Sequence, residues 1–147
     1  MNIVVAPVLG EVEFRVVYAL WQAMAKFLGP PNRGVLRGAM KQGQLLVARC
    51  GALVGGFIHF HLRRDGVVTI YDVAVSPLVR RQGIGKMLVE TVAALSPVGK
   101  VKLKCTTTNP ANLFYKRCGF TLLGTEPSTN TTLNVWERTQ DAHANHP

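Results

Sequence analysis

Long apolar runs and paired cysteines are absent from this chain of 147 residues. No apolar run reaches the roughly 18–20 residues that would span a membrane. The first residues lack the basic and apolar regions of a secretion signal. The three cysteines, Cys50, Cys105 and Cys118, are an odd number without paired spacing, which disfavours a disulfide framework and a zinc site. We therefore expect no membrane association, no bound metal and a reducing, cytoplasmic environment.

Acidic residues are also few, because 8 stand against 17 lysines and arginines, which gives a formal net charge of +9. This excess favours an anionic partner: a phosphorylated cofactor, an acidic peptide surface or nucleic acid. Steering of an anionic cofactor is the simplest interpretation. Binding of nucleic acid would require the basic residues to gather on one face, ideally with exposed aromatic residues.

Apolar residues make up 48% of the chain, which is enough to bury a core. The length favours one domain, expected over residues 1–138, followed by a flexible polar tail over 139–147. Apolar spacing predicts strands over 3–5, 45–49, 54–62, 67–75, 101–106, 120–124 and 132–136. Helices are predicted over 11–28, 35–41, 85–95 and 111–117. This order predicts an α/β fold of the α+β type, a mixed, mainly antiparallel central sheet of about 6–7 strands flanked on both faces by about 4 helices.

Between the strand at 67–75 and the helix after it lies a short basic turn with two glycines, Gly83 and Gly85. The N-terminus of a helix presents unpaired N–H groups and the positive end of the helix dipole, and glycine lets a phosphate approach the backbone closely. Additional positive charge comes from Arg80, Arg81 and Lys86. We therefore expect this turn to bind a pyrophosphate.

The dinucleotide fingerprint is not met because Leu88 stands in its third glycine place, and the phosphate-loop pattern fails because Met87 follows Lys86. The pattern that is present, Arg80-x-x-Gly83-x-Gly85, resembles the acyl-CoA pyrophosphate loop of the GNAT family of N-acetyltransferases. A second segment resembles that family's other motif, an Asn, an Ala, then Tyr and Gly-Phe: Asn109-Pro110-Ala111-Asn112-Leu113-Phe114-Tyr115-Lys116-Arg117-Cys118-Gly119-Phe120. The two motifs occur in the family's order and at its usual separation.

The resemblance implies an N-acetyltransferase domain that uses acetyl-CoA as co-substrate and needs no metal. In the family, the main chain of the strand before the loop pairs with the pantetheine amides, and the pyrophosphate lies on the N–H groups of the loop. The arginine side chains of the loop are either part of this site or surface charge. The residues expected to bind the cofactor are Val73, Ala74, Val75, Arg80, Arg81, Gln82, Gly83, Ile84, Gly85, Lys86, Asn109 and Phe114.

Tyr115 matches the family's tyrosine beside the CoA sulfur, where a phenol can donate a proton to the leaving thiolate. The alternative is an aromatic ring that packs its helix against the sheet, a role that Phe114 takes more readily. A backbone N–H near Val75 would polarise the thioester carbonyl. Thr108 stands where many relatives have an asparagine, so Asn109 either bonds to pantetheine or caps the helix.

The sequence leaves open which residue acts as the general base. The chain also resembles the family branch that acetylates the N-termini of ribosomal proteins, which has a glutamate base in the strand before Asn109, but no acidic residue lies between Lys102 and Thr106. One candidate is Asp72, because a carboxylate in an apolar strand is either functional or satisfied by a hydrogen bond. The others are His59 and His61, which share a strand face. The expected catalytic residues are Tyr115, Asp72 and His59.

The first hypothesis is an enzyme, a monomer or homodimer, in which a primary amine of a small molecule or peptide attacks acetyl-CoA in a ternary complex. Its acceptor would lie between the loop at 30–34, the strand with His59 and His61, and a loop at 127–132. The missing glutamate keeps a non-catalytic acyl-CoA-binding or regulatory module open, and the charge of +9 keeps a nucleic-acid-directed protein open. An acyl-cysteine route is disfavoured because neither Cys105 nor Cys118 has a His or Asp nearby in sequence.

Overall fold

The computed structural model describes residues 2–140, which divide into two compact units. The first unit contains residues 2–60 and 72–91, and the second contains 61–71 and 92–140. Seven strands pair in the order β1-β2-β3-β4-β5-β7-β6. The β4–β5 pair is parallel, whereas β1–β2, β2–β3, β5–β7 and β6–β7 are antiparallel. The predicted mixed, mainly antiparallel sheet is therefore confirmed.

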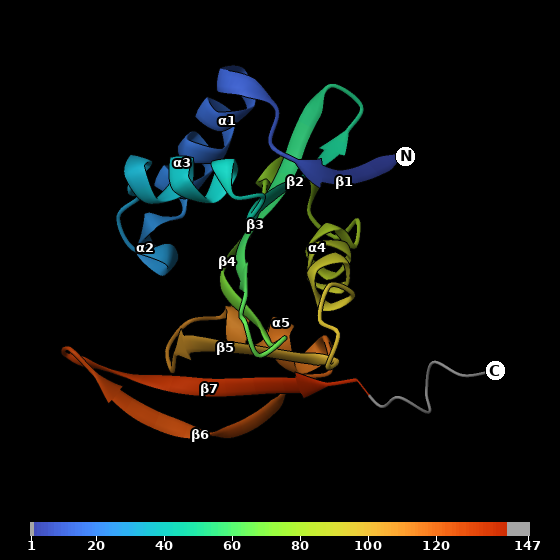
Figure 1. The fold of residues 1–147 in the computed structure, drawn as a ribbon. Coiled ribbons are helices and arrows are strands. Elements are labelled where there is room, and N and C mark those ends of the chain that lie inside the picture. Colours follow the sequence, from blue (N-terminus) through green and yellow to red (C-terminus); the bar gives the residue numbers. More distant parts are fainter. Residues whose placement is uncertain (1, 141–147) are drawn as a thin grey trace. The chain divides into compact units, whose positions relative to one another are not determined.

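The first unit has helices on both sides of its strands (Figure 1). Helices α1, α2 and α3 lie on one side of β2 and β3, and α4 lies on the other. β3 and β4 continue into the second unit. The bounds of these elements are β1 Ile3–Pro7, α1 Gly10–Ala23, α2 Ala25–Leu28, α3 Arg33–Lys41, β2 Leu45–Cys50, β3 Leu53–Leu62, β4 Val68–Val75, a 3-10 helix Pro77–Val79 and α4 Ile84–Ala93.

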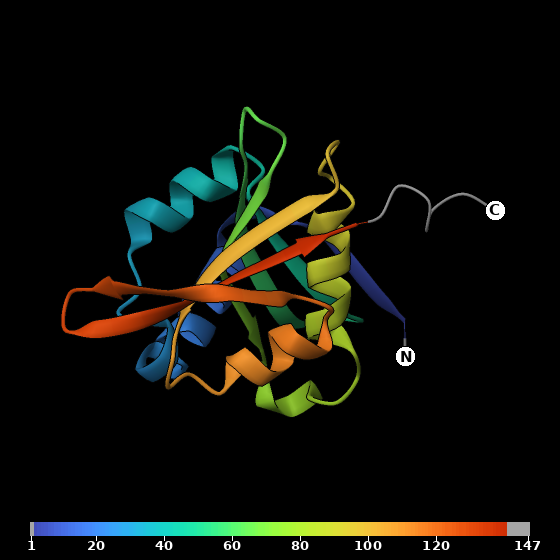
Figure 2. The same cartoon turned by 90° about the horizontal axis from the view of Figure 1, so that it is seen from below.

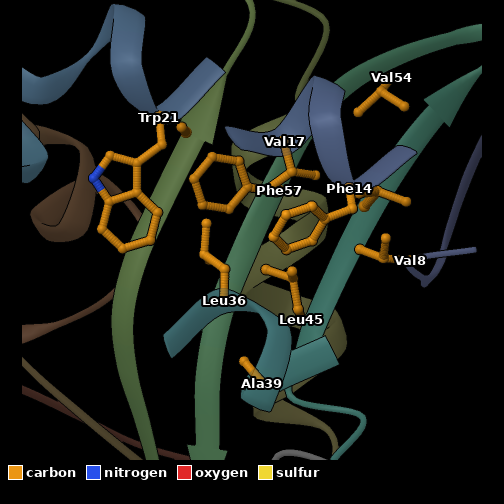
Figure 3. Close-up of a cluster of buried hydrophobic side chains, with 11 residues drawn as sticks. Val8, Phe14, Val17, Trp21, Leu36, Ala39, Leu45, Val54 and Phe57 are labelled. Carbon is orange, nitrogen blue, oxygen red and sulfur yellow. The ribbon is translucent and has the colours of Figure 1, made fainter. Parts of the chain in front are cut away.

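The core of this unit forms where α1 and α3 cover β2 and β3 (Figure 3). Phe14, Val17 and Trp21 recur at helical spacing on α1 and are all buried. Trp21 stacks on Phe57 of β3 with ring centroids 5.9 Å apart. Burial of each large apolar side chain stabilises the fold by about 1.5–3 kcal/mol. The apolar spacing that predicted the N-terminal helix therefore identified its buried face.

The predicted helix over 11–28 divides at Met24 into α1 and α2, so the described residues contain five α-helices rather than four. Met24 has the non-helical torsions φ −111° and ψ 16°. The break accompanies a long-range hydrogen bond, because the Trp21 indole N–H donates to the Gly29 carbonyl at 2.9 Å. Apolar spacing alone does not reveal this break because both pieces keep the helical period.

An ion pair joins α1 to β2. The Arg49 guanidinium donates two hydrogen bonds to the Glu13 carboxylate, the Nη2 bond measuring 2.7 Å, and Nη2 also donates to the Pro7 carbonyl at 2.9 Å. The Leu9 N–H donates to the same carboxylate at 2.6 Å. The bonds from Arg49, more than the one from Leu9, lower the pKa of Glu13 against a partial cost of burial.

This pair predicts a pH-dependent contribution to stability. Because the pKa of Glu13 is lower in the folded chain than its ordinary value of 4.5, the pair favours folding above that pH, and the contribution is lost as the pH falls through the folded-state pKa. Glu13→Gln is expected to lower the free energy of unfolding by about 1 kcal/mol at neutral pH. Urea titrations at neutral and acidic pH should show the difference shrinking under acid, while Glu126→Gln, in an exposed pair with Lys104, changes little. An equal Glu13→Gln effect at both pH values would contradict this account.

The second unit is a strand layer with one helix beside it, seen in Figure 2. It begins with the hairpin between β3 and β4, where the Arg63 N–H donates to the Val67 carbonyl at 2.9 Å. The chain turns at Asp65-Gly66, a dipeptide typical of hairpins, with Gly66 at φ +87°. The remaining elements are β5 Lys100–Thr106, α5 Ala111–Arg117, β6 Thr121–Ser128 and β7 Thr131–Thr139.

The last two strands are longer than predicted. The expected loop at 127–132 is therefore wrong, because β6 and β7 take up most of these residues. β6 and β7 pair as far as Ser128 with Thr131, so that only Thr129 and Asn130 turn the chain. Asn130 adopts a left-handed φ of +60°, which asparagine tolerates better than most residues. The threonines in this segment are β-branched and suit strands, and Pro127 is acceptable because β6 is an edge strand.

The predicted tail overlaps the last strand, because β7 ends at Thr139. Residues 141–147 of that tail lie outside the described residues, and the 1–138 boundary stays a prediction. Within residues 2–140, no helix has the length and apolar character needed to cross a membrane.

Candidate functional site

The turn between β4 and α4 has a backbone suited to an anion. Arg81 and Gly83 adopt left-handed φ angles of +64° and +77°. This conformation costs roughly 1–2 kcal/mol for a residue such as Arg81, so its presence points to a constrained, functional turn. A Cβ at Gly83 would meet no atom within 4 Å, so the space beside its backbone is open. The first turn of α4 contains no acidic residue, which leaves its N-terminal dipole available to a ligand.

Positive side chains surround this turn. Arg80, Arg81 and Lys86 are all exposed. Among residues 2–140, no carboxylate forms an ion pair with any of the three. Their charge is therefore not neutralised by the described part of the protein and can serve a phosphate group.

Two glycines in β3 bring α4 close to the strands. A Cβ at Gly56 would lie 2.6 Å from the Ala74 carbonyl oxygen and 3.3 Å from Ile84 Cγ2. A Cβ at Gly55 would lie 2.8 Å from the Cys50 sulfur. Sequence reasoning missed these residues, although the Gly-Gly pair inside a predicted strand was a signal of close backbone approach. They hold the start of α4 against β3 and β4. The turn at residues 80–86, here called the anion-adapted turn, is held with it.

The side chains near the C-terminal end of β4 differ in burial. Ala74 is buried in the core cluster with α1 and α3, whereas Val73 and Val75 are half-buried. The pairing of β4 with β5 runs from Val68 with Val101 to Ile70 with Leu103, although β4 continues to Val75. Binding of pantetheine by the main chain of residues 73–75 stays a prediction.

Two separately predicted catalytic candidates meet in the first unit. His59 Nδ1 lies 3.5 Å from Asp72 Oδ2, and the two side chains are only 9% and 15% exposed. The His59 ring also tilts against Trp21, with centroids 6.4 Å apart. A carboxylate at Nδ1 orients an imidazole and leaves Nε2 as the nitrogen for proton transfer. Asp72 thus lies within ion-pair distance of a titratable side chain.

His61 does not join this pair. It lies two residues further along β3, within the second unit, and is partly exposed. The two histidines therefore differ in burial although the strand alternation places them on one face. Of the three predicted base candidates, the structure brings together His59 and Asp72.

Tyr115 lies on α5 in the second unit, and its ring is buried. It makes edge contacts with Phe114 and Phe120, whose ring centroids lie 5.3 Å and 5.8 Å from its own. The packing role considered for this helix thus falls on Tyr115 as well as on half-buried Phe114. Asn109 Oδ1 accepts a hydrogen bond from the Ala111 N–H at 2.8 Å, just before α5, whose N-cap residue is Pro110.

Asn112 is a structural residue that sequence reasoning missed. Its Nδ2 donates to the carbonyls of Thr106 and Asn109, both at 2.8 Å. Its Oδ1 accepts hydrogen bonds from Trp136 Nε1 at 2.8 Å and Asn134 Nδ2 at 3.0 Å. The amide therefore fixes the end of β5, the start of α5 and β7 to one another. Its place inside the second motif was a signal, but the β7 partners are 22 and 24 residues away.

The chemistry of the remaining candidates is simpler. Burial raises the pKa of the Cys105 thiol to about 11, so this cysteine carries almost no thiolate at neutral pH and is a poor nucleophile. Within the described part of the chain, no group of three or more His, Cys, Asp or Glu side chains is arranged to hold a metal ion. The roles predicted for the cofactor-binding and catalytic residues stay predictions.

Comparison with known proteins agrees with these features. No curated protein matches the sequence. Ard1 from Thermoplasma volcanium shares the fold with a TM-score of 0.80 and 20% identity, over 95% of this chain and 98% of that chain. The ribosomal-protein-S18-alanine N-acetyltransferase from Escherichia coli has a TM-score of 0.73 and 19% identity, over 94% of both chains. A structure of the NatC complex bound to Gag peptide and CoA has a TM-score of 0.75 and 21% identity, over 96% of this chain and 100% of that chain.

These identities are low and indicate a shared fold. The family itself follows from the sequence, because residues 41–122, more than half of the chain, match the acetyltransferase (GNAT) domain. The matched segment includes the anion-adapted turn, the His59–Asp72 pair and the motif around Tyr115. The chain belongs to the GNAT acetyltransferase family.

Proposed function

We propose that this protein is an acetyl-CoA-dependent N-acetyltransferase whose acceptor is a primary amine. The turn at residues 80–86 is the observation that carries the proposal, because Gly83 has open space beside its backbone and no carboxylate within residues 2–140 pairs with the positive side chains of the turn. The NatC complex, with CoA and a peptide, supports the choice of cofactor and keeps a peptide acceptor in view. The cytoplasm is the proposed location.

The cofactor would be held by main chain more than by side chains. The N–H groups of residues 81–86 would bind the pyrophosphate, and the main chain of 73–75 would pair with the pantetheine amides. Bound acetyl-CoA supplies the activated acetyl group. Asn109 and Phe114 would border its pantetheine arm, and a backbone N–H near Val75 would stabilise the developing oxyanion.

Side chains of the protein would then accept and donate the protons of the reaction. His59 Nε2 would accept a proton from the acceptor amine, and Asp72 would hold the imidazole in the required orientation. The nitrogen would add to the acetyl carbonyl carbon to give a tetrahedral oxyanion, and the carbon–sulfur bond would break as the carbonyl forms again. Tyr115 would donate its phenolic proton to the departing thiolate sulfur. The step needs a ternary complex and no acyl-enzyme, in keeping with the protonated state of Cys105.

Binding of coenzyme A to the Gly83 variant tests the site directly. Gly83→Ala forces a side chain onto a φ of +77° and is expected to weaken binding about tenfold or more in isothermal calorimetry, because the turn must shift. Gly43→Ala is the matched control, since Gly43 has a φ of +71° and equally open space away from the turn. The control should lose similar stability and keep its affinity for coenzyme A.

Failure of the wild-type protein to bind coenzyme A would overturn the proposed function. Binding without transfer to any amine in a panel of peptides, small amines and aminoglycosides would instead support the non-catalytic module. That second candidate is favoured by one observation, since β5 carries no carboxylate between Lys102 and Thr106.

A further inference from the structure

Charge is distributed unevenly along the first unit. Residues 14–60 contain six lysines and arginines and no acidic residue. Arg37 is neutralised, because it forms two hydrogen bonds of 2.7 and 2.8 Å with Glu11, and Arg49 is neutralised by Glu13. Lys26, Arg33 and Lys41, here called the cationic edge, are exposed on α2 and α3 and have no ion pair within residues 2–140.

Aromatic rings beneath Lys26 and Arg33 indicate which anion these two cations suit. The Arg33 guanidinium lies 4.4 Å from the centroid of the Tyr18 ring, and Lys26 Nζ lies 5.6 Å from that of Phe27. The cations cover ring faces on which a nucleic-acid base would stack. A guanidinium resting on a ring still presents its N–H edge, which matches a carboxylate. The surface therefore favours carboxylates over bases.

This edge is joined to the His59–Asp72 pair through Trp21. Trp21 lies one turn after Tyr18 on α1, and its ring tilts against the His59 ring with centroids 6.4 Å apart. Its indole N–H also holds the Gly29 carbonyl, which lies between Lys26 and Arg33 in the chain. The same part of α1 thus contacts Arg33 of the cationic edge through Tyr18 and the His59 ring through Trp21.

We propose that the acceptor is the amine of an acidic peptide, selected by Lys26, Arg33 and Lys41. This inference rests on the proposed acetyltransferase function and narrows its substrate. Positive potential beside a reactive site speeds the encounter with anionic partners and slows that with cationic ones, with a strong dependence on ionic strength. Polyamines and lysine-rich tails are therefore poor acceptors.

The test compares two peptides that share an N-terminal alanine and differ in the next three residues, all aspartate or all serine. At low salt, wild-type kcat/KM should be about tenfold higher for the acidic peptide, and the ratio should fall at high salt. Arg33→Glu should reduce the ratio to below about threefold. Arg33→Lys keeps the charge and should keep the preference. Arg64→Glu, a charge reversal at another exposed arginine without an ion pair in the described residues, should leave it unchanged.

Two controls separate this inference from the proposed function. Acetylation of both peptides at equal rates would support the proposed acetyltransferase function and overturn the charge preference. If neither peptide is acetylated, fluorescence anisotropy still measures the binding of an N-acetylated acidic peptide to the cationic edge. Binding that is lost in Arg33→Glu would support the inference, and equal binding of the serine peptide would overturn it. Tighter binding of a single-stranded oligonucleotide that displaces the peptide would also overturn it.

Discussion

Replacing Tyr115 with phenylalanine is expected to lower kcat about 100-fold while the affinity for acetyl-CoA changes little, because general-acid catalysis contributes on the order of 100-fold or more. The substitution removes one oxygen and keeps the ring, so the edge contacts with Phe114 and Phe120 persist. Steady-state kinetics would give kcat, and calorimetry would give the cofactor affinity. A loss in kcat alone is typical of a group that acts in the transition state.

Tyr18→Phe is the matched control for this experiment. It deletes the same atom from a half-buried tyrosine on α1 and keeps the ring under Arg33. Both variants should unfold at nearly the wild-type temperature. Unchanged turnover in Tyr115→Phe would remove the acid role and leave Tyr115 as a core residue of the second unit.

Replacing His59 with glutamine is expected to lower kcat/KM about 100-fold at neutral pH, because the amine loses its base. Asp72→Asn should cost less, about tenfold, because it removes the group that orients the imidazole rather than the imidazole itself. Activity of His59→Gln should recover as the pH rises past about 8, where a peptide amine loses its proton to water. The pH profile of kcat/KM would show this recovery.

His61→Gln controls for loss of a histidine from the same strand and should remain nearly wild type. The double variant at His59 and Asp72 tests whether the pair acts as a unit. If it does, the double variant loses little more than His59→Gln alone, because Asp72 works only through the imidazole. Additive losses, or equal losses in His59→Gln and His61→Gln, would reject the pair as the base.

Local patterns were enough for much of the fold. The predicted bounds of α5 at residues 111–117 agree with the structure, and strands β2 to β5 were placed to within one residue at each end. These elements have strong apolar periodicity and clear stops at glycine, proline or an Asp-Gly turn. The prediction of β6 and β7 was weaker, because threonine-rich strand ends resemble a loop when their pairing partner is unknown.

The sequence by itself determined the fold class and the glycine-containing turn between β4 and α4, because both depend on short-range order: a strand, two glycines and a helix that follow one another. It also predicted the helix at residues 111–117 that carries Tyr115 within the second motif. Only the tertiary structure decided that His59 and Asp72 meet, that the Trp21 indole N–H donates to the Gly29 carbonyl, and that Asn112 ties three segments together. These contacts join groups that lie 6 to 24 residues apart in the chain, and strand register and helix packing, rather than local patterns, bring the groups together.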